Sequence, residues 1–358
     1  MTLYDKIAAG ERIGAGEAAH LLAEGDLLQL GRLADERRCA LHPGNTATFQ
    51  IDRNINYTNI CECRCRFCAF FREAGAPDAY LLSVEEVLAK TDEAVRLGAT
   101  QVMLQGGLHP GLGLEYFEEL FRAIKQKFPV IIHSLSPPEV QHLARRTGFG
   151  LKELLQRLRA AGLDSMPGGG AEILSDRVRR EISPHKISSA QWLAVMEAAH
   201  AIGMHTTATM MIGSVETIDE RARHLELVRS LQDRTGGFRA FIPWTFKPGN
   251  SDLEPAAEVS AFDYLRLLAV ARIYLDNIPN IQGSWLTQGR DVGQVCLYFG
   301  ANDLGSIMLE ENVVAAAGAR NSITEQEMVA LIRGAGRVPK QRNTRYEIVK
   351  EYPGPAET

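Results

Sequence analysis

The sequence predicts an α/β fold, a (β/α)8 barrel of the TIM type with short helices before it and a helix and tail after it. The chain has 358 residues and is 45% hydrophobic, which is enough to bury a large core. From about residue 50, short apolar runs alternate with segments of helical periodicity, as in repeated βα units around a parallel sheet. Eight such units can be counted, which is the number that closes a barrel.

The predicted elements follow one another in the order strand, loop and helix. Residues 1–46 predict a helical segment, residues 47–320 the barrel, and residues 321–358 a C-terminal helix with a basic, proline-containing tail. The expected strands, each followed by a loop and a helical pattern, are 54–59, 100–105, 130–134, 163–166, 205–212, 238–246, 280–286 and 304–309.

Residues at the expected helix ends support this assignment. Ser83 and Glu86 form the pattern of a capping box, and Gly98 ends the apolar face that follows. Pro137 and Pro138 can begin another helix, because proline is tolerated in the first helical turn.

Composition and charge exclude several classes of partner. The net charge of −5 is spread without any block of like charges, so we expect no nucleic acid and no anionic membrane surface. No apolar run reaches the length of a membrane-spanning helix, and the acidic residues near the start argue against a signal peptide. A small-molecule substrate is the remaining expectation.

Four of the six cysteines lie within eight residues, at positions 61, 63, 65 and 68. Thiolates this close repel one another unless a metal or cluster neutralises them. A reducing compartment would keep them as thiols until the metal arrives, so we expect a cytoplasmic protein. Cys39 and Cys296 stand alone and are expected to be buried apolar residues.

The spacing of Cys61, Cys65 and Cys68 is C-x3-C-x2-C, with Phe67 before the last cysteine. Three thiolates on a tight loop can bind three irons of a 4Fe–4S cluster, leaving the fourth iron for the amino and carboxylate groups of S-adenosylmethionine. A structural zinc site is the alternative, but it normally takes two separated ligand pairs, and no second C-x2-C pair exists. Cys63 could complete a closed four-thiolate site; we predict that it is a bystander.

Two glycine-containing stretches follow predicted strands and resemble S-adenosylmethionine contacts. Gln105, Gly106 and Gly107 resemble the element that binds the methionine amino group in radical S-adenosylmethionine enzymes, although a plain turn would also explain two glycines. Met211 and Gly213, in the pattern M-x-G-x-x-E, resemble the loop beside the adenine.

The remaining candidates follow other predicted strands. Glu172, after three consecutive glycines, is expected to bind the ribose or act as a catalytic base, unless it only caps the helix at 175–182. Arg180 on that helix is a candidate for the S-adenosylmethionine carboxylate. Three histidines near strand ends could move a proton or be structural, and none is assigned: His109, His133 and His205.

Several longer runs resemble one family within the radical S-adenosylmethionine enzymes, the cyclic dehypoxanthine futalosine synthases of the futalosine route to menaquinone. The resemblance covers roughly residues 40 to 350, through the runs 52–59, 100–107, 132–135, 162–165 and 233–243. Cys63 within the motif and the residues around Pro167 depart from the family pattern.

The resemblance implies a 4Fe–4S cluster, S-adenosylmethionine and an electron donor of the flavodoxin or ferredoxin type. It also implies that a 5′-deoxyadenosyl radical removes hydrogen from C4′ of dehypoxanthine futalosine, and that the carbon radical then closes a ring on the benzoate. The proton-accepting base is not identified by the sequence, and the carboxylate-binding residues are open among Arg239, Lys247 and Arg290.

Aminofutalosine synthase and the radical enzymes that make a deazaflavin cofactor are the nearest alternatives. They share the cysteine spacing and differ in the substrate pocket. A non-enzymatic iron–sulfur scaffold protein is a remote alternative, since it would need no polar residues at other strand ends. The oligomeric state is open.

Overall fold

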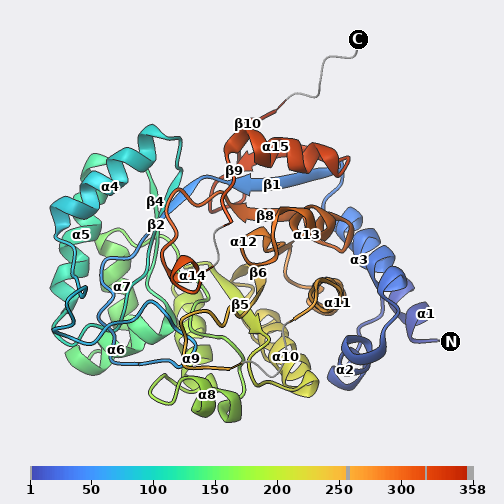
Figure 1. Cartoon of the computed structure of the whole chain (residues 1–358), viewed down its shortest axis with the longest axis horizontal. Coiled ribbons are helices and arrows are strands. Elements are labelled where there is room, and N and C mark those ends of the chain that lie inside the picture. The colour runs from blue at the N-terminus through green and yellow to red at the C-terminus, as the bar shows by residue number, and fades with distance from the viewer. Residues whose placement is uncertain (1, 255–258, 319–320, 353–358) are drawn as a thin grey trace.

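The computed structural model describes residues 2–254, 259–318 and 321–352, and its strands form a ring seen nearly end-on in Figure 1. The strands of the ring are β1 (Thr46–Gln50), β2 (Asp52–Ile55), β3 (Gln101–Leu104), β4 (Ile131–Ser134), β5 (Thr206–Ile212), β6 (Phe238–Thr245), β7 (Asn280–Ile281) and β8 (Asp303–Ser306).

All pairings around this ring are parallel. The strands β2, β3 and β4 are hydrogen-bonded in that order, as are β5, β6 and β7, and β8 pairs with β1. Isolated bridges join the groups, from His133 through Ser165 and Met166 to Thr206, and from Gln282 to Asp303. Because β1 runs directly into β2, the ring closes, and the predicted (β/α)8 barrel is confirmed.

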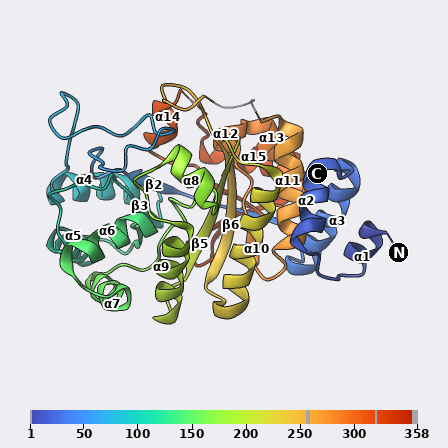
Figure 2. The same cartoon turned by 90° about the horizontal axis from the view of Figure 1, so that it is seen from below.

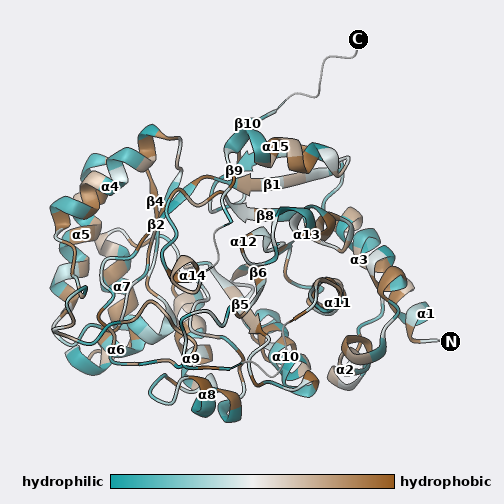
Figure 3. Cartoon of the chain, in the orientation of Figure 1, coloured by the Kyte–Doolittle hydropathy of each residue, from teal (hydrophilic) through white to brown (hydrophobic). Residues whose placement is uncertain are grey.

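Helices cover the outside of the barrel, and the amphipathic ones turn their apolar faces inward (Figure 3). On α5, for example, Phe117, Leu120, Phe121 and Ile124 recur at helical spacing and are buried. The outer helices are α4 (Val84–Arg96), α5 (Leu114–Lys127), α6 (Pro137–Thr147), α7 (Leu151–Ala161), α9 (Ser189–Ala201), α10 (Ile218–Thr235) and α11 (Ala261–Tyr274).

Shorter helices lie in the connecting loops. They are α8 (Asp176–Ile182), α12 (Trp285–Gln288), α13 (Arg290–Val295), the 3-10 turn η1 (Cys296–Tyr298) and α14 (Val313–Ala316). Figure 2 shows the barrel from the side, with α12, α14 and the long loop between β2 and α4 at the carboxyl end of β5 and β6.

The predicted helix starts are confirmed. The Ser83 amide donates to the Glu86 carboxylate over 2.7 Å, and the Glu86 amide donates to the Ser83 hydroxyl over 3.2 Å. Pro137 is the first residue of α6. These contacts satisfy amides that a helix leaves unpaired in its first turn.

The N-terminal helices α1 (Leu3–Ala8), α2 (Ala15–Glu24) and α3 (Leu27–Leu41) lie beside the barrel, where α2 and α3 pack against α10 and α11 (Figure 1). Arg12, between α1 and α2, forms ion pairs of 2.8 Å with Asp233 and with Asp276. No helix among the described residues has the length and apolar composition needed to cross a membrane.

The first strand differs from the expected range of 54–59, because the paired residues begin at Thr46 and end at Ile55. The polar residues after Ile55 bind a loop instead of a neighbouring strand. The Thr58 hydroxyl donates to the Tyr80 carbonyl over 2.6 Å, and the Asn59 amide group donates to the Asp78 carbonyl over 2.9 Å.

The C-terminal part differs more. The expected helix is confirmed as α15 (Glu325–Gly334), but the predicted tail is wrong, since it forms β9 (Val338–Arg342) and β10 (Ile348–Glu351). Strand β9 pairs in parallel with β1, and β10 pairs antiparallel with β9. Strands β9 and β10 therefore extend the sheet beside β1 (Figure 1).

Candidate functional site

A cavity of about 400 Å³ lies inside the barrel. One end is lined by the loop that carries the clustered cysteines, after the carboxyl end of β2. The other end is lined by residues of β9 and the loop that follows it. Barrel active sites are built at the carboxyl ends of the strands, so we call the cysteine end the mouth and the β9 end the floor.

Backbone contacts hold the cysteine loop against neighbouring parts of the mouth. The Leu108 amide donates to the Cys61 thiol over 3.3 Å, and the Glu62 amide donates to the Leu108 carbonyl over 3.1 Å. The Arg66 amide donates to the Ile182 carbonyl at the end of α8 over 2.9 Å. The loop is therefore fixed by the β3 and α8 regions together.

The thiols of Cys61, Cys63, Cys65 and Cys68 all line the cavity. Cys63 lies within hydrogen-bonding reach of both Cys61 and Cys65, and this contact lowers the pKa of Cys61 to about 6. Cys68 accepts backbone hydrogen bonds from Phe70. Amides directed at thiol sulfurs are a common means of stabilising iron–sulfur clusters.

The donor set of this loop suits an iron–sulfur cluster. The four cysteines all line one end of the cavity. Each thiolate of a cubane binds a different iron, so three thiolates on one loop can bind three irons. A closed zinc site would normally take a second ligand pair, and the sequence holds no second C-x2-C pair.

A buried ion pair lies beside the thiols. The Lys186 ammonium is 2.7 Å from the Glu172 carboxylate and 4.9 Å from the centre of the Phe67 ring, and all three residues line the cavity. Burial alone would lower the pKa of Lys186, but the charges of Cys65, Glu172 and Cys63 raise it overall. Lys186 therefore keeps its positive charge next to the cysteine loop.

Glu172 is 4% exposed and has a φ of +41°, a left-handed conformation that is uncommon for a residue other than glycine. Its carboxylate pairs with Lys186, whereas the N-cap of α8 is Ser175. The strained backbone thus directs the carboxylate into the mouth, as is often found at functional sites.

The predicted glycine pair allows β3 and the cysteine loop to approach each other closely. A side-chain carbon on Gly107 would lie 2.2 Å from the Ile60 carbonyl oxygen, and one on Gly106 would lie 2.6 Å from the Tyr57 ring. Gln105 also lines the cavity, together with both glycines. The two glycines are therefore required by packing, in addition to any contact with a ligand.

Other predicted residues are not brought to the cavity. Arg180 is exposed on the outer side of α8, and the residues lining the cavity do not include it. Its neighbour Arg179 is buried and donates to the carbonyls of Gly170, Ala171 and Ile187. Successive residues of a helix point in different directions, so the side chain of Arg180 faces solvent when that of Arg179 faces inward.

Met211 and Gly213 also lie outside the lining of the cavity. The Met211 amide donates to the Glu172 carbonyl over 2.9 Å, so this segment supports the loop that carries Glu172. The Gly213 amide donates to the Glu216 carboxylate over 2.7 Å. The motif therefore holds its own turn and the neighbouring loop in place.

Of the three candidate histidines, the structure places one in the lining of the cavity. His133 on β4 lines the cavity, whereas His205 is exposed just before β5. His109 accepts a hydrogen bond from the Gly111 amide over 2.9 Å in a loop. Of the proposed carboxylate-binding residues, Arg290 pairs with Glu327 at the surface, and neither Arg239 nor Lys247 lines the cavity.

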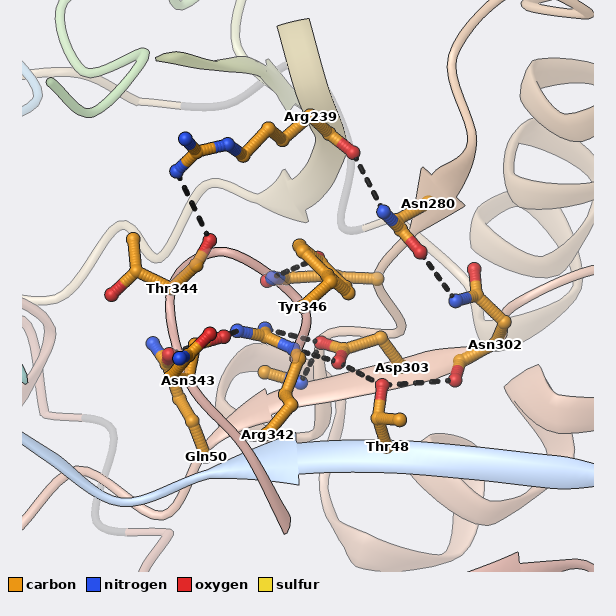
Figure 4. Close-up of polar contacts among 12 residues, drawn as sticks. Thr48, Gln50, Arg239, Asn280, Asn302, Asp303, Arg342, Asn343, Thr344 and Tyr346 are labelled. Carbon is orange, nitrogen blue, oxygen red and sulfur yellow. Dashed lines mark hydrogen bonds and ion pairs between the residues drawn. The ribbon is translucent and has the colours of Figure 1, made fainter. Parts of the chain in front are cut away.

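Sequence reasoning missed the floor of the cavity (Figure 4). Arg342 at the end of β9 pairs with Asp303 over 2.8 Å and donates to Gln50 over 2.8 Å. The Tyr346 ring packs 3.9 Å from the Arg342 guanidinium carbon, and the Gln282 amide donates to the Tyr346 hydroxyl over 3.2 Å.

One sequence signal could have indicated this polar interior. Gln50, Asp52, Asn54 and Asn56 alternate along β1, β2 and the residue that follows β2, and all four line the cavity. A period of two places such side chains on one face of a strand. Lys186 has no comparable signal, because it lies in the loop between α8 and α9.

Comparisons with known proteins agree with this geometry. Residues 55–228 match the family described as the Radical SAM superfamily, where SAM denotes S-adenosylmethionine. Residues 235–354 match the family described as CofH/MqnC C-terminal region. The two matches together run from the end of β2 through β10.

Similar curated proteins cover almost the whole chain. The cyclic dehypoxanthine futalosine synthase of Streptomyces coelicolor is 48% identical over 99% of this chain and 90% of its own length. That of Halalkalibacterium halodurans is 44% identical over 98% and 95%. A 5-amino-6-(D-ribitylamino)uracil–L-tyrosine 4-hydroxyphenyl transferase of Methanosarcina barkeri is 44% identical over 92% and 89%.

Solved structures support the fold alone. The FeFe-hydrogenase maturase HydG of Carboxydothermus hydrogenoformans aligns with a TM-score of 0.79 at 19% identity, covering 96% of this chain and 80% of its own. Methylornithine synthase PylB aligns with a TM-score of 0.71 at 19% identity, covering 94% and 95%.

Proposed function

The chain belongs to the radical SAM superfamily and, within it, to the family of the cyclic dehypoxanthine futalosine synthases, and we propose on this basis that it cyclises dehypoxanthine futalosine in menaquinone biosynthesis. The protein is a radical SAM enzyme. The observation that carries the proposal is the three-cysteine loop at the mouth of a closed barrel with a polar interior.

We propose that Cys61, Cys65 and Cys68 hold the 4Fe–4S cluster and that Cys63 is not a ligand. All of these thiols line the cavity, and Cys61 accepts the Leu108 amide. When bound and reduced, the cluster supplies the electron that cleaves S-adenosylmethionine to methionine and a 5′-deoxyadenosyl radical.

The S-adenosylmethionine would lie across the mouth. Gln105, Gly106 and Gly107 would allow close backbone approach for its amino group, and Phe67, which lines the cavity with the cysteines, would lie beside the cluster. Glu172 would bind the ribose hydroxyls. Lys186, whose ammonium pairs with Glu172 in the mouth, would supply the cation that the sequence led us to expect from Arg180.

The barrel interior would hold the substrate with its sugar towards the mouth. There the radical removes hydrogen from C4′, and the new carbon radical adds to the benzoate ring. The enclosing strands exclude water and fix the distance between the two reacting carbons, which directs a reactive radical to one product.

A reduced flavodoxin or ferredoxin is the proposed electron donor. Cys61 and Cys68 are only partly buried at the mouth, so a donor protein could approach the cluster. Because the cluster thiols need a reducing compartment before assembly, we place the protein in the cytoplasm.

The test uses anaerobically reconstituted protein, a reductant, S-adenosylmethionine and dehypoxanthine futalosine deuterated at C4′. We expect deuterated 5′-deoxyadenosine and a product lighter than the unlabelled substrate by two hydrogens, both measured by mass spectrometry. Unlabelled deoxyadenosine with intact substrate would contradict the proposal.

Two parallel incubations separate the alternatives. An adenosyl adduct with an enolpyruvyl benzoate would identify an aminofutalosine synthase. A product from 5-amino-6-(D-ribitylamino)uracil and tyrosine would identify the activity named for the Methanosarcina relative.

A further inference from the structure

A layer of side chains crosses the middle of the cavity. In the strand register, Asn54 on β2 lies opposite Met103 on β3, and Met103 lies opposite His133 on β4. All three line the cavity. The layer lies between the cysteine mouth and the floor, because Gln101, two residues before Met103, contacts Thr344 of the floor.

Two polar atoms of this layer are buried without a hydrogen-bond partner among the described residues, namely Nδ1 of His133 and Oδ1 of Asn54. Leaving such an atom unpaired is unfavourable, because it loses its hydrogen bonds to water and gains none in return. Two of them in one layer of a cavity indicate a position that a polar ligand satisfies.

The carboxylates that line the cavity already form hydrogen bonds or ion pairs with other residues of the protein. Asp52 accepts from Ser306 and Gln101 over 2.5 Å each. Glu139 accepts from Tyr57 over 2.6 Å, and Glu172 pairs with Lys186.

Glu311, the remaining carboxylate of the lining, accepts the amides of Val313 and Val314 at the start of α14. His133 differs from these carboxylates because, among the described residues, its buried Nδ1 has no hydrogen-bond partner and is free to accept a proton from a ligand. Burial, together with the guanidinium groups of Arg239 and Arg342, lowers the pKa of His133 to about 3. The imidazole is thus neutral near pH 7 and carries one unprotonated nitrogen.

The surroundings of His133 suit an aromatic ring. Met103, Ile242, Trp244 and Leu304 contribute apolar lining to the same cavity. An aromatic acid could place its ring against these side chains, between the radical source at the mouth and the polar floor. The leaving ring hydrogen would then be near the middle layer.

We propose that His133 is the base that accepts the proton lost from the benzoate ring after cyclisation, an inference that rests on the proposed function. One hydrogen atom of C4′ goes to the deoxyadenosyl radical, and a bond forms between C4′ and a ring carbon. The ring carbon–hydrogen bond then breaks. Its proton goes to the imidazole, and the remaining electron goes to a one-electron oxidant, an oxidised iron–sulfur cluster. Aromaticity is restored, so a weakly basic acceptor is sufficient.

The test is His133→Gln, with the C4′-deuterated substrate. We expect deuterium transfer to 5′-deoxyadenosine within about threefold of the parent rate, while formation of the cyclic product falls about 100-fold, a typical contribution of a general base. An organic radical should accumulate in the electron paramagnetic resonance spectrum of samples frozen during turnover. This signal is independent of product formation.

The matched control is His205→Gln, which changes an exposed histidine outside the cavity and should leave both measurements unchanged. Iron content and thermal melting establish that each variant is folded, and His133→Asn gives the same test if the glutamine variant is not.

Two results would overturn the assignment of His133. One is a variant that still couples deuterium transfer to product formation. The other is a folded variant that loses both steps equally, since this indicates substrate binding. If the parent protein itself gives no deuterated deoxyadenosine, the proposed function fails, and the role of His133 fails with it.

Discussion

At the scale of single residues, Cys63 is unusual because its thiol lies between those of Cys61 and Cys65 instead of pointing away from them. Its thiol also lies 3.9 Å from the His185 carbonyl oxygen. The spacing of the motif predicts which three cysteines are ligands, but it does not determine in which direction the side chain of Cys63, two residues along an irregular loop, points.

We expect Cys63→Ala to retain about four irons and four sulfides per chain and to remain active, because three thiolates already supply the protein ligands that a site-differentiated cubane needs. The variants Cys61→Ala, Cys65→Ala and Cys68→Ala should each lose the cluster. Iron and sulfide analysis of anaerobic protein checks this. Loss of iron in Cys63→Ala, or one zinc per chain in the parent, would contradict the ligand assignment.

The residues that sequence reasoning placed wrongly are those whose role depends on which way a helix or loop faces. Arg179 and Arg180 are adjacent, and only the packing of α8 decides that the first is buried and the second exposed. Lys186 was missed because a lysine in a loop is normally solvated. Its burial against Glu172 and Phe67 becomes visible only when α8 and the cysteine loop are brought together.

At the scale of elements, the contact between the β3 loop and the cysteine loop depends on Gly107. We expect Gly107→Ala to reduce cluster retention strongly, because the added carbon would lie 2.2 Å from the Ile60 carbonyl oxygen and force the loops apart. The control is Gly150→Ala, where nothing lies within 4 Å of the added carbon. Iron content after reconstitution is the measurement, and equal iron in both variants would show that the loops can separate without consequence.

The pair of Arg342 and Asp303 connects β9 to β8, and the two residues are 2% and 0% exposed. We expect Arg342→Met to cost about 3 kcal/mol, because it leaves a buried carboxylate without its partner. The melting temperature should fall by several degrees, and adding Asp303→Asn should recover part of the loss. An unchanged melting temperature in the single variant would mean that β9 contributes little to the closure of the barrel.

The alternation of strands and helices was predictable because each βα unit has its own periodicity and its own helix caps. Strand β9 was not, because Val338–Arg342 is short, basic and contains Pro339, which is unfavourable in most strand positions. Its pairing with β1 is a contact between distant parts of the sequence. Local patterns carry no information about such a pairing.

At the scale of the whole molecule, the repeated βα units of the sequence predict the barrel. They do not predict the floor that β9 and the loop after it form. At the floor, Arg342 and Thr344 are buried and Tyr346 is half-buried, and Asp52 and Gln101 next to it are buried. Cys61 and Cys68 at the mouth are partly exposed. The cavity therefore opens towards solvent at the cysteine end.

Because the cavity opens at the cysteine end, we expect its ligands to bind in a fixed order. The molecule that occupies the deeper part has to arrive before S-adenosylmethionine covers the mouth, and it has to wait for deoxyadenosine and methionine to depart before it can leave. We therefore expect protein preincubated with S-adenosylmethionine to show a lag when dehypoxanthine futalosine is added, and protein preincubated with the substrate to show none. Equal progress curves in rapid-mixing experiments would point to a second route into the barrel. The floor that β9 and the loop after it form is thus expected to fix the order in which the substrate and S-adenosylmethionine bind.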